Sequence, residues 1–211
     1  MRLLIENVAA SYGARPVLAN VTLALAGGEV LVVTGANGSG KSTLLRLLSG
    51  LQRPTHGAIT YELGGQSYAP SEAGALLGWV APDLALYREL SALENLRFFA
   101  DVRGLRRSAA DLDALLDRVG LDGRGHDRVA SYSTGMTQRL RYAYALLHQP
   151  PVLLLDEPTA TLDERGIALV ERLVAEQRMR GITVVATNDP RELRWGDYLL
   201  TLGAQSAERR T

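Results

Sequence analysis

Cysteine is absent from this sequence of 211 residues, which excludes disulfide bonds, thiol chemistry and metal sites with cysteine ligands. An excess of either charge is also absent. The 23 Lys and Arg residues balance 23 Asp and Glu residues, so bulk charge indicates neither nucleic acid nor an anionic membrane as a partner. Apolar runs fall short of the roughly 20 residues that span a bilayer. The apolar N-terminal stretch is too short for a signal peptide and Glu6 follows early, so we expect a cytosolic protein that needs a partner to associate with a membrane.

Lysine is nearly absent: Lys41 is the only lysine, and the other 22 basic residues are arginine. It lies in TGANGSGKSTLL, where Gly35 to Ser42 fit G-x-x-x-x-G-K-[ST] between a predicted buried strand, EVLVVT, and a predicted helix. Such a phosphate loop curls its backbone N–H groups toward phosphate oxygens. Lysine can reach the β- and γ-phosphates, whereas the forked guanidinium of arginine is bulkier and aimed differently. A plain glycine-rich turn, the alternative, does not explain the lysine.

The loop therefore predicts a nucleotide-binding site, with the Ser42 hydroxyl also directed to Mg²⁺. The residues predicted to bind nucleotide are Gly35, Ala36, Asn37, Gly38, Ser39, Gly40, Lys41, Ser42 and Thr43.

A second part of the site is predicted in VLLLDEP, from Val152 to Pro158. Its apolar residues predict a buried strand that ends at Asp156 and Glu157, and ligands bind at the carboxyl ends of strands in open α/β sheets. We expect Asp156 to hold Mg²⁺ through water. Glu157 is expected to orient and deprotonate the water that attacks the γ-phosphate. An acidic turn after a core strand is the alternative, and the phosphate loop argues against it.

The order of predicted elements indicates the fold class. Residues 2 to 34 contain short apolar segments broken by glycine and proline, which predict strands joined by turns. Residues 91 to 147 are predicted to be mostly helical, with Ser108 as one N-cap. From Val152 onward strands and helices alternate, which predicts a parallel α/β sheet. The tail from Ala204 to Thr211 is predicted to be disordered.

A third motif carries a family resemblance. The stretch YSTGM, from Tyr132 to Met136 and followed by Gln138 and Arg139, resembles the LSGGQ signature of ABC-type ATPases and lies at the family's spacing before Asp156. Further matches extend the resemblance to an ABC-transporter ATP-binding subunit over residues 2 to 203. They are SYGARPVL, LQRPTHGAIT, SALENLRFFADVRG and DEPTATLDERG.

The resemblance implies a single ABC ATPase domain over residues 1–211, with the P-loop NTPase fold. Its core sheet would be mostly parallel, with an N-terminal antiparallel β part and an inserted helical subdomain. The nucleotide-binding core would comprise residues 1–82 and 145–203. Residues 83–144 would form the helical subdomain with the signature, and residues 204–211 the tail.

The resemblance also implies a mechanism and partners. Two copies would bind head to tail as a homodimer, each ATP lying between the phosphate loop of one and Ser133 and Gly135 of the other. Tyr12 matches the aromatic residue that stacks on adenine, although it could also be a turn tyrosine that packs on the sheet. Asp163 belongs to the loop that links the two sites. ATP would bind with Mg²⁺, and separate membrane permease subunits would hold the protein at the cytoplasmic face of the cell membrane, with no nucleic acid partner.

Two positions depart from the family pattern. Pro82 stands where the family has a glutamine that contacts Mg²⁺ and the attacking water, and only its neighbour Asp83 has a polar side chain in this coupling loop. Asn188 stands where the family has a histidine that contacts the γ-phosphate. Asparagine can donate a hydrogen bond but carries no charge. These departures leave open a nucleotide-binding module that hydrolyses ATP poorly.

The transported cargo is a finer question. The compact length and the phrase ELSALENLRFFADVRG resemble the ATP-binding subunit of the haem exporter of cytochrome c maturation. Another small ABC export cassette is an equal alternative. A soluble ABC ATPase that serves DNA repair, ribosomes or cluster assembly is a third, although the chain lacks the paired cassettes and long insertions usual in that class. We expect an ATPase coupled to export.

Overall fold

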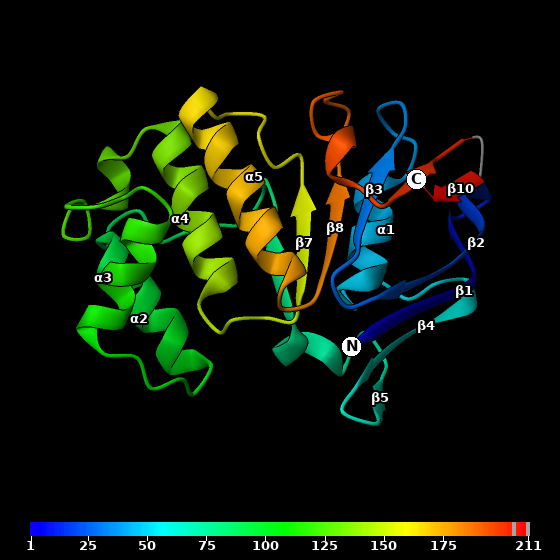
Figure 1. The fold of residues 1–211 in the computed structure, drawn as a ribbon, viewed down its shortest axis with the longest axis horizontal. Helices are drawn as coiled ribbons and strands as arrows, with labels where there is room; N and C mark the ends of the chain where they lie inside the picture. The colour runs from blue at the N-terminus through cyan, green and yellow to red at the C-terminus, as the bar shows by residue number, and fades with distance from the viewer. Residues whose placement is uncertain (204–205, 210–211) are drawn as a thin grey trace.

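A six-stranded sheet forms the centre of the computed structural model, which describes residues 1–203 and 206–209 (Figure 1). Neighbouring strands from β9 through β3, β8 and β7 to β6 are parallel, and β10 adds an antiparallel edge. The prediction of a mostly parallel core sheet is confirmed. The strands are β3 (Val30–Thr34), β6 (Leu77–Val80), β7 (Val152–Asp156), β8 (Ile182–Ala186), β9 (Tyr198–Thr201) and β10 (Ser206–Arg209).

Both faces of this sheet are covered, which explains why its central strands are continuous apolar runs. In β3, Leu31 and Val33 pack in one core with helix α1 (Lys41–Leu48) and the N-terminal strands. Val30 and Val32 point to the other core, which contains helices α4 (Thr134–Leu146) and α5 (Glu164–Arg178). Alternation of side chains along the strand therefore separates two hydrophobic cores.

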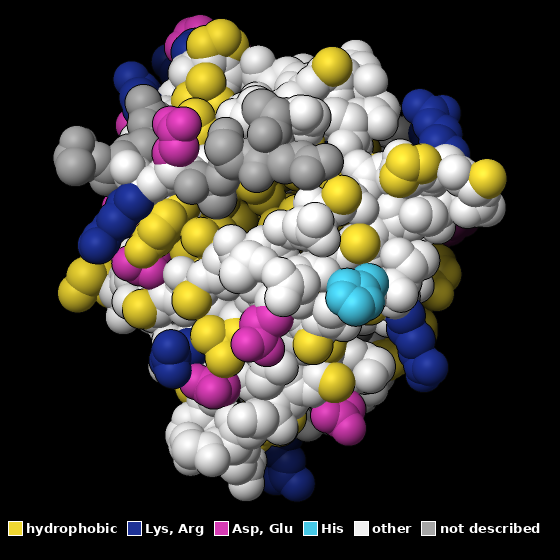
Figure 2. Space-filling view, turned by 90° about the vertical axis from the view of Figure 1, so that its right-hand side faces the viewer, with side chains coloured by type: hydrophobic (Ala, Val, Ile, Leu, Met, Phe, Trp, Pro, Cys, Tyr) yellow, Lys and Arg dark blue, Asp and Glu magenta, His cyan; other side chains and the backbone are white. Residues whose placement is uncertain are grey.

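A second sheet is antiparallel and lies beside the parallel one, in the order β2-β1-β4-β5. The outer surface on this side of the molecule carries interspersed acidic and basic side chains with scattered hydrophobic ones (Figure 2). This sheet is the antiparallel β part that the resemblance implied. Its strands are β1 (Arg2–Tyr12), β2 (Arg15–Ala26), β4 (His56–Leu63) and β5 (Gln66–Tyr68).

A helical part formed by α2 (Ala92–Val102), α3 (Ala109–Arg118) and α4 projects from the opposite side (Figure 1). Serine side chains define where these helices begin, because each accepts a hydrogen bond from an otherwise unpaired N–H in the first turn. Ser91 and Ser108 form capping boxes and Ser133 caps α4, so the predicted N-cap at Ser108 is confirmed. Within the described residues, every helix is too short or too polar to cross a membrane. Three short 3₁₀ turns complete the elements of the described part of the chain: η1 (Ala73–Leu76), η2 (Val129–Ser131) and η3 (Leu193–Trp195).

The prediction of a disordered tail is wrong for Ser206–Arg209, which forms β10. Its backbone pairs antiparallel with β9, from Ser206 opposite Thr201 to Arg209 opposite Tyr198. Main-chain hydrogen bonds to an edge strand need no apolar pattern, so the polar sequence did not reveal the strand. The other tail positions, 204–205 and 210–211, lie outside the described residues.

Candidate nucleotide-binding site

The phosphate loop, Gly35–Ser42, connects the carboxyl end of β3 to α1. Its glycines at 35, 38 and 40 all have positive φ angles, of 147°, 79° and 107°. Space is also restricted: a Cβ atom on Gly40 would lie 2.8 Å from Val17 Cγ1, and one on Gly35 would lie 2.7 Å from Ser39 Oγ. At Gly35 and Gly40 only glycine satisfies both conditions, while at Gly38 the positive φ alone favours glycine.

Lys41 is folded across its own loop and is 7% exposed. Its Nζ donates a hydrogen bond of 2.8 Å to the Gly35 carbonyl oxygen and lies 4.0 Å from Glu157 Oε1. A compact ammonium group fits this narrow position, where a planar guanidinium would have to displace the loop. The structure thus brings the predicted lysine and the predicted general base together.

Asp156 is the last residue of β7 and is 6% exposed. Burial raises the pKa of its carboxyl group, and a hydrogen bond from the Ser42 side chain acts in the opposite direction. The two predicted metal ligands are therefore neighbours and offer a hydroxyl and a carboxylate oxygen. This donor set fits Mg²⁺, which prefers oxygen ligands and keeps several waters when it binds beside phosphates.

Glu157 follows in a left-handed backbone conformation, with φ of 47°. Its N–H donates to the Ala186 carbonyl oxygen at 2.9 Å. Burial raises the pKa of its carboxyl group, while the charge of Lys41 and a hydrogen bond from the Asn188 backbone N–H oppose the rise. A carboxylate with a raised pKa is a better proton acceptor, as a general base requires.

Asn188 lies just beyond β8 and reaches the phosphate loop. Its side-chain Nδ2 donates to Asn37 Oδ1 at 2.9 Å. The side chain therefore occupies the edge of the site, while its backbone N–H serves the Glu157 carboxyl group. Asn188 thus lies beside the phosphate loop, and a catalytic role for it stays a prediction.

Tyr12 ends β1 with its side chain half exposed, and its hydroxyl donates to Gln52 Oε1 at 2.9 Å. The ring lines a cavity of about 580 Å³ together with the phosphate loop and Glu157. Three residues that line this cavity are not predicted by the sequence motifs: Arg15, Val17 and Arg46. Arg46 follows Ser42 by four helical positions, so helical spacing from the motif could have found it. The hairpin pairing that brings Arg15 and Val17 here has no comparable local signal.

The loop after β6 places Asp83 near the site. Its charge raises the pKa of Asp156 and also acts on Arg141 of α4. The Arg141 Nε donates to the Leu84 carbonyl oxygen at 3.1 Å, which ties this loop to the signature helix. Pro82 is exposed and has no polar side-chain atom, so Asp83 supplies the charge that this loop contributes.

The signature residues form a separate group at the N-terminus of α4. Ser133 caps the helix, and Gly135 approaches the Thr161 carbonyl oxygen. Asp163 caps α5 and pairs with Arg139 at 3.1 Å. These residues line a cavity of about 390 Å³ that shares no lining residue with the phosphate-loop cavity. Within one chain, the structure does not bring the signature onto the phosphate loop.

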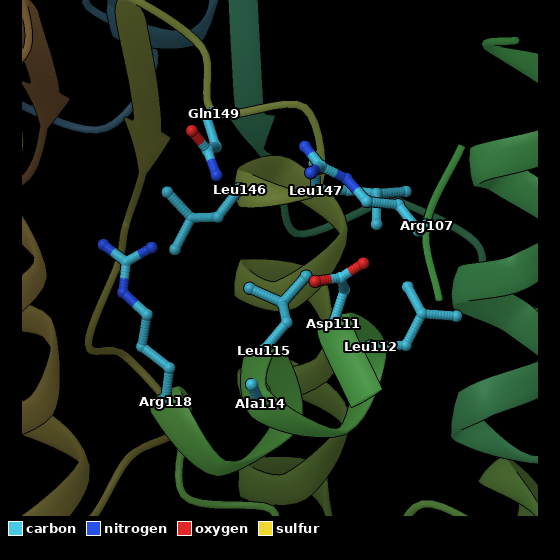
Figure 3. A pocket seen from close by; sticks show the side chains of 9 residues that line it. All are labelled: Arg107, Asp111, Leu112, Ala114, Leu115, Arg118, Leu146, Leu147 and Gln149. Atoms are coloured by element: carbon cyan, nitrogen blue, oxygen red, sulfur yellow. The ribbon is translucent and has the colours of Figure 1, made fainter. Parts of the chain in front are cut away.

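Figure 3 shows another cavity, of about 230 Å³, between α3 and the end of α4. Its arginines are already engaged: the Arg107 guanidinium donates twice to the Leu147 carbonyl oxygen, and Arg118 pairs with Glu176 at 2.6 Å. Asp111 completes the capping box of its own helix. These polar groups hold the helices together, which argues against a catalytic role for this cavity.

A parallel α/β sheet with a phosphate loop, a buried lysine and an Asp-Glu pair at a strand end defines a P-loop nucleoside triphosphatase. A profile described as "ABC transporter" matches residues 18–160, which is more than half of the chain. The chain therefore belongs to the ABC transporter family, as an ATP-binding subunit.

Curated relatives include transport proteins of more than one kind. The chain is 40% identical over 210 residues to the cytochrome c biogenesis ATP-binding export protein CcmA of Mesorhizobium japonicum, covering 100% of this chain and 98% of the relative. It is 34% identical over 184 residues to the lantibiotic transport ATP-binding protein SrtF of Streptococcus pyogenes, covering 87% and 78%.

Solved structures agree with the fold. An ATP-binding subunit of an ABC transporter superposes with a TM-score of 0.85 at 28% identity, covering 99% of this chain and 90% of that chain. The ATP-binding cassette MJ0796, a dimer in a post-hydrolysis state with ADP and phosphate, gives a TM-score of 0.83 at 25% identity, with 99% of each chain covered. Family membership and this product complex support ATP hydrolysis as the activity.

Lys41→Arg is expected to weaken ATP binding, because the guanidinium does not fit the position that Lys41 Nζ occupies beside Gly35. Loss of one charge-assisted hydrogen bond corresponds to a decrease of roughly ten- to a hundred-fold in affinity. Titration with a fluorescent ATP analogue measures the change. Arg97→Lys, at an exposed position of α2, is the matched control and should bind as wild type. Wild-type affinity in Lys41→Arg would contradict the assigned role.

Proposed function

We propose that the protein binds and hydrolyses ATP as the energy-supplying subunit of an exporter, at the cytoplasmic face of the cell membrane. Separate integral membrane subunits would form the transport path. One observation supports the proposal: Lys41, Ser42 and Glu157 line one cavity at the phosphate loop, and Asp156 lies next to Ser42. An isolated phosphate-binding loop would not need a general base next to its lysine.

Binding of ATP is proposed to use the phosphate loop and Tyr12. Backbone N–H groups of the loop and the N-terminal end of α1 face the phosphates, and Lys41 exchanges its bond to Gly35 for phosphate oxygens. The half-exposed Tyr12 ring provides a surface for adenine. Ser42 and Asp156 would hold Mg²⁺, which when bound neutralises phosphate charge.

Hydrolysis is proposed to depend on Glu157 as the general base. Its carboxylate accepts a proton from the water that attacks the γ-phosphate, and burial favours this transfer by raising its pKa. The Asn188 backbone N–H orients that carboxylate, and the Asn188 amide turns from Asn37 toward the γ-phosphate. The departing ADP remains held by the phosphate loop.

The complete site is proposed to form between two copies of the chain. Ser133 and Gly135 lie at a helix N-terminus, which attracts anions, yet they are separate from the phosphate loop of their own chain. Phosphates bound to one chain would therefore meet the signature of the other. Asp163, paired with Arg139 at this edge, would link the two sites.

Glu157→Gln tests the general base and the dimer together. The amide preserves shape but not basicity, so hydrolysis should slow by about 10²–10⁴-fold. ATP binding should persist, and an ATP-bound dimer should accumulate in size-exclusion chromatography with light scattering. Glu164→Gln, at an exposed glutamate at the start of α5, should hydrolyse ATP as wild type. A Glu157→Gln variant that stays monomeric with ATP at high protein concentration would rule out the shared site.

Asn188 should support slow but real hydrolysis. A neutral hydrogen bond is worth about 1 kcal/mol against roughly 1.5–3 for a charge-assisted one, so Asn188→His should raise turnover by on the order of ten-fold. Asn188→Ala keeps the backbone N–H but removes the amide, and should lower turnover. Phosphate release at saturating Mg-ATP compares the three proteins. Equal rates for alanine and asparagine would favour the alternative of a poorly hydrolysing nucleotide-binding module.

Haem export for cytochrome c maturation is the cargo we propose. The support is 40% identity to a CcmA protein over essentially the whole length of both chains. The similarity to a lantibiotic transport protein supports a second candidate function, that of another small export cassette. We expect the chain to copurify with the membrane subunits encoded beside it, and haem to stimulate ATP hydrolysis by the reconstituted complex. An assembled complex that ignores haem but responds to an apolar peptide would overturn the cargo assignment.

A further inference from the structure

We propose that Glu192, which lies outside the nucleotide cavity, is a positioning residue that fixes Glu157 and Asn188 relative to each other. The inference rests on the proposed function, because it assumes that these two residues act in hydrolysis. Glu192 is 1% exposed and precedes the short 3₁₀ turn η3. A carboxyl group is rarely buried this deeply without a specific partner, since its desolvation is costly.

The first link runs from Glu192 to the segment after Glu157. The hydroxyl of Thr159, itself buried, donates to Glu192 Oε1. Pro158 lies between Glu157 and Thr159, and its carbonyl oxygen accepts a hydrogen bond of 3.1 Å from the hydroxyl of Tyr142, a fully buried residue of α4. The two residues that follow Glu157 are therefore held from two sides.

The second link holds the loop that carries Asn188. The Glu192 N–H donates to the Asp189 carbonyl oxygen at 3.1 Å, and the Asp189 N–H donates to Thr187 Oγ1 at 2.9 Å. Glu192 Oε2 is buried with no hydrogen-bond partner among the described residues, so the bond from Thr159 to Oε1 is what holds this side chain. The Glu192 side chain thus crosses from the loop containing Asn188 to the segment that follows Glu157.

This connection matters because Glu157 has a φ of 47°, a conformation that a residue with a side chain keeps only when its surroundings enforce it. Its carboxyl group also receives the backbone N–H of Asn188, so the two loops must keep a fixed separation. Release of Thr159 from Glu192 would let this separation vary. Small displacements of a catalytic group greatly reduce the rate while substrate still binds.

Glu192→Ala should therefore lower kcat by about ten- to a hundred-fold and leave ATP affinity close to wild type. Glu192→Gln keeps an acceptor oxygen for Thr159 and should restore most of the rate. Thr159→Val removes only the donor and should lower kcat to a similar extent, which provides a test even where Glu192→Ala folds poorly. Because both changes break one link, the double variant should be no slower than Glu192→Ala alone.

Gln177→Ala is the matched control. Gln177 is 2% exposed, and its side-chain Nε2 donates a hydrogen bond of 2.9 Å to the Pro150 carbonyl oxygen, away from the nucleotide cavity. This variant should lower the melting temperature as a buried polar truncation does, while kcat stays unchanged. A kcat close to wild type in Glu192→Ala and Thr159→Val, or losses that multiply in the double variant, would overturn the inference.

Glu157→Gln in the same assay distinguishes failure of the positioning role of Glu192 from failure of the proposed hydrolysis itself. If Glu157→Gln is inactive while Glu192→Ala and Thr159→Val turn over normally, only the positioning role fails. If Glu157→Gln retains wild-type turnover, the proposed chemistry fails, whatever the Glu192 variants do.

Discussion

Parallel pairing of β3, β8 and β7 is the constraint on which the whole candidate site depends. Val33 and Asp156 both lie in register with Ala186, so the three strands end at one level. Just beyond this level, the Thr187 N–H donates to the Val33 carbonyl oxygen at 2.9 Å. The Glu157 N–H donates to Ala186 in the same way. The phosphate loop, the acidic pair and the Asn188 loop therefore leave the sheet together, although they are far apart in sequence.

Local chemistry decides which parts of this arrangement the sequence could predict. The phosphate loop and the strand ending in Asp156 could be predicted because phosphate and metal chemistry dictates their residue types and spacing. Glu192 was not, since a single glutamate in a polar loop looks like a solvated side chain until the fold buries it beside Thr159. The strand Ser206–Arg209 was missed for a related reason. It depends on an edge provided by β9, which no pattern within the tail reveals.

The charges of the acidic pair at the site are arranged around the ammonium group of Lys41. Lys41 lies beside Glu157 and lowers the pKa values of both Glu157 and Asp156, against burial, which raises them. Two partly buried carboxyl groups next to each other would repel strongly without this ammonium group. The lysine therefore has a role in the free protein as well as a proposed one toward phosphate. This dual role gives a physical reason for the single lysine among 22 arginines.

Because of the two departures from the family pattern, backbone hydrogen bonds contribute more to the orientation of Glu157. Pro82 has no side-chain donor, and Asn188 carries no charge, so neither can orient the attacking water by charge. Besides the Lys41 ammonium group, Glu157 has support from the main chain: its own N–H is bonded to Ala186, and the Asn188 N–H lies at its carboxyl group. Backbone contacts of this kind are only as constant as the loops that carry them. A buried carboxyl group that fastens those loops to each other, as Glu192 is placed to do, is then the means by which such a site would keep its catalytic geometry.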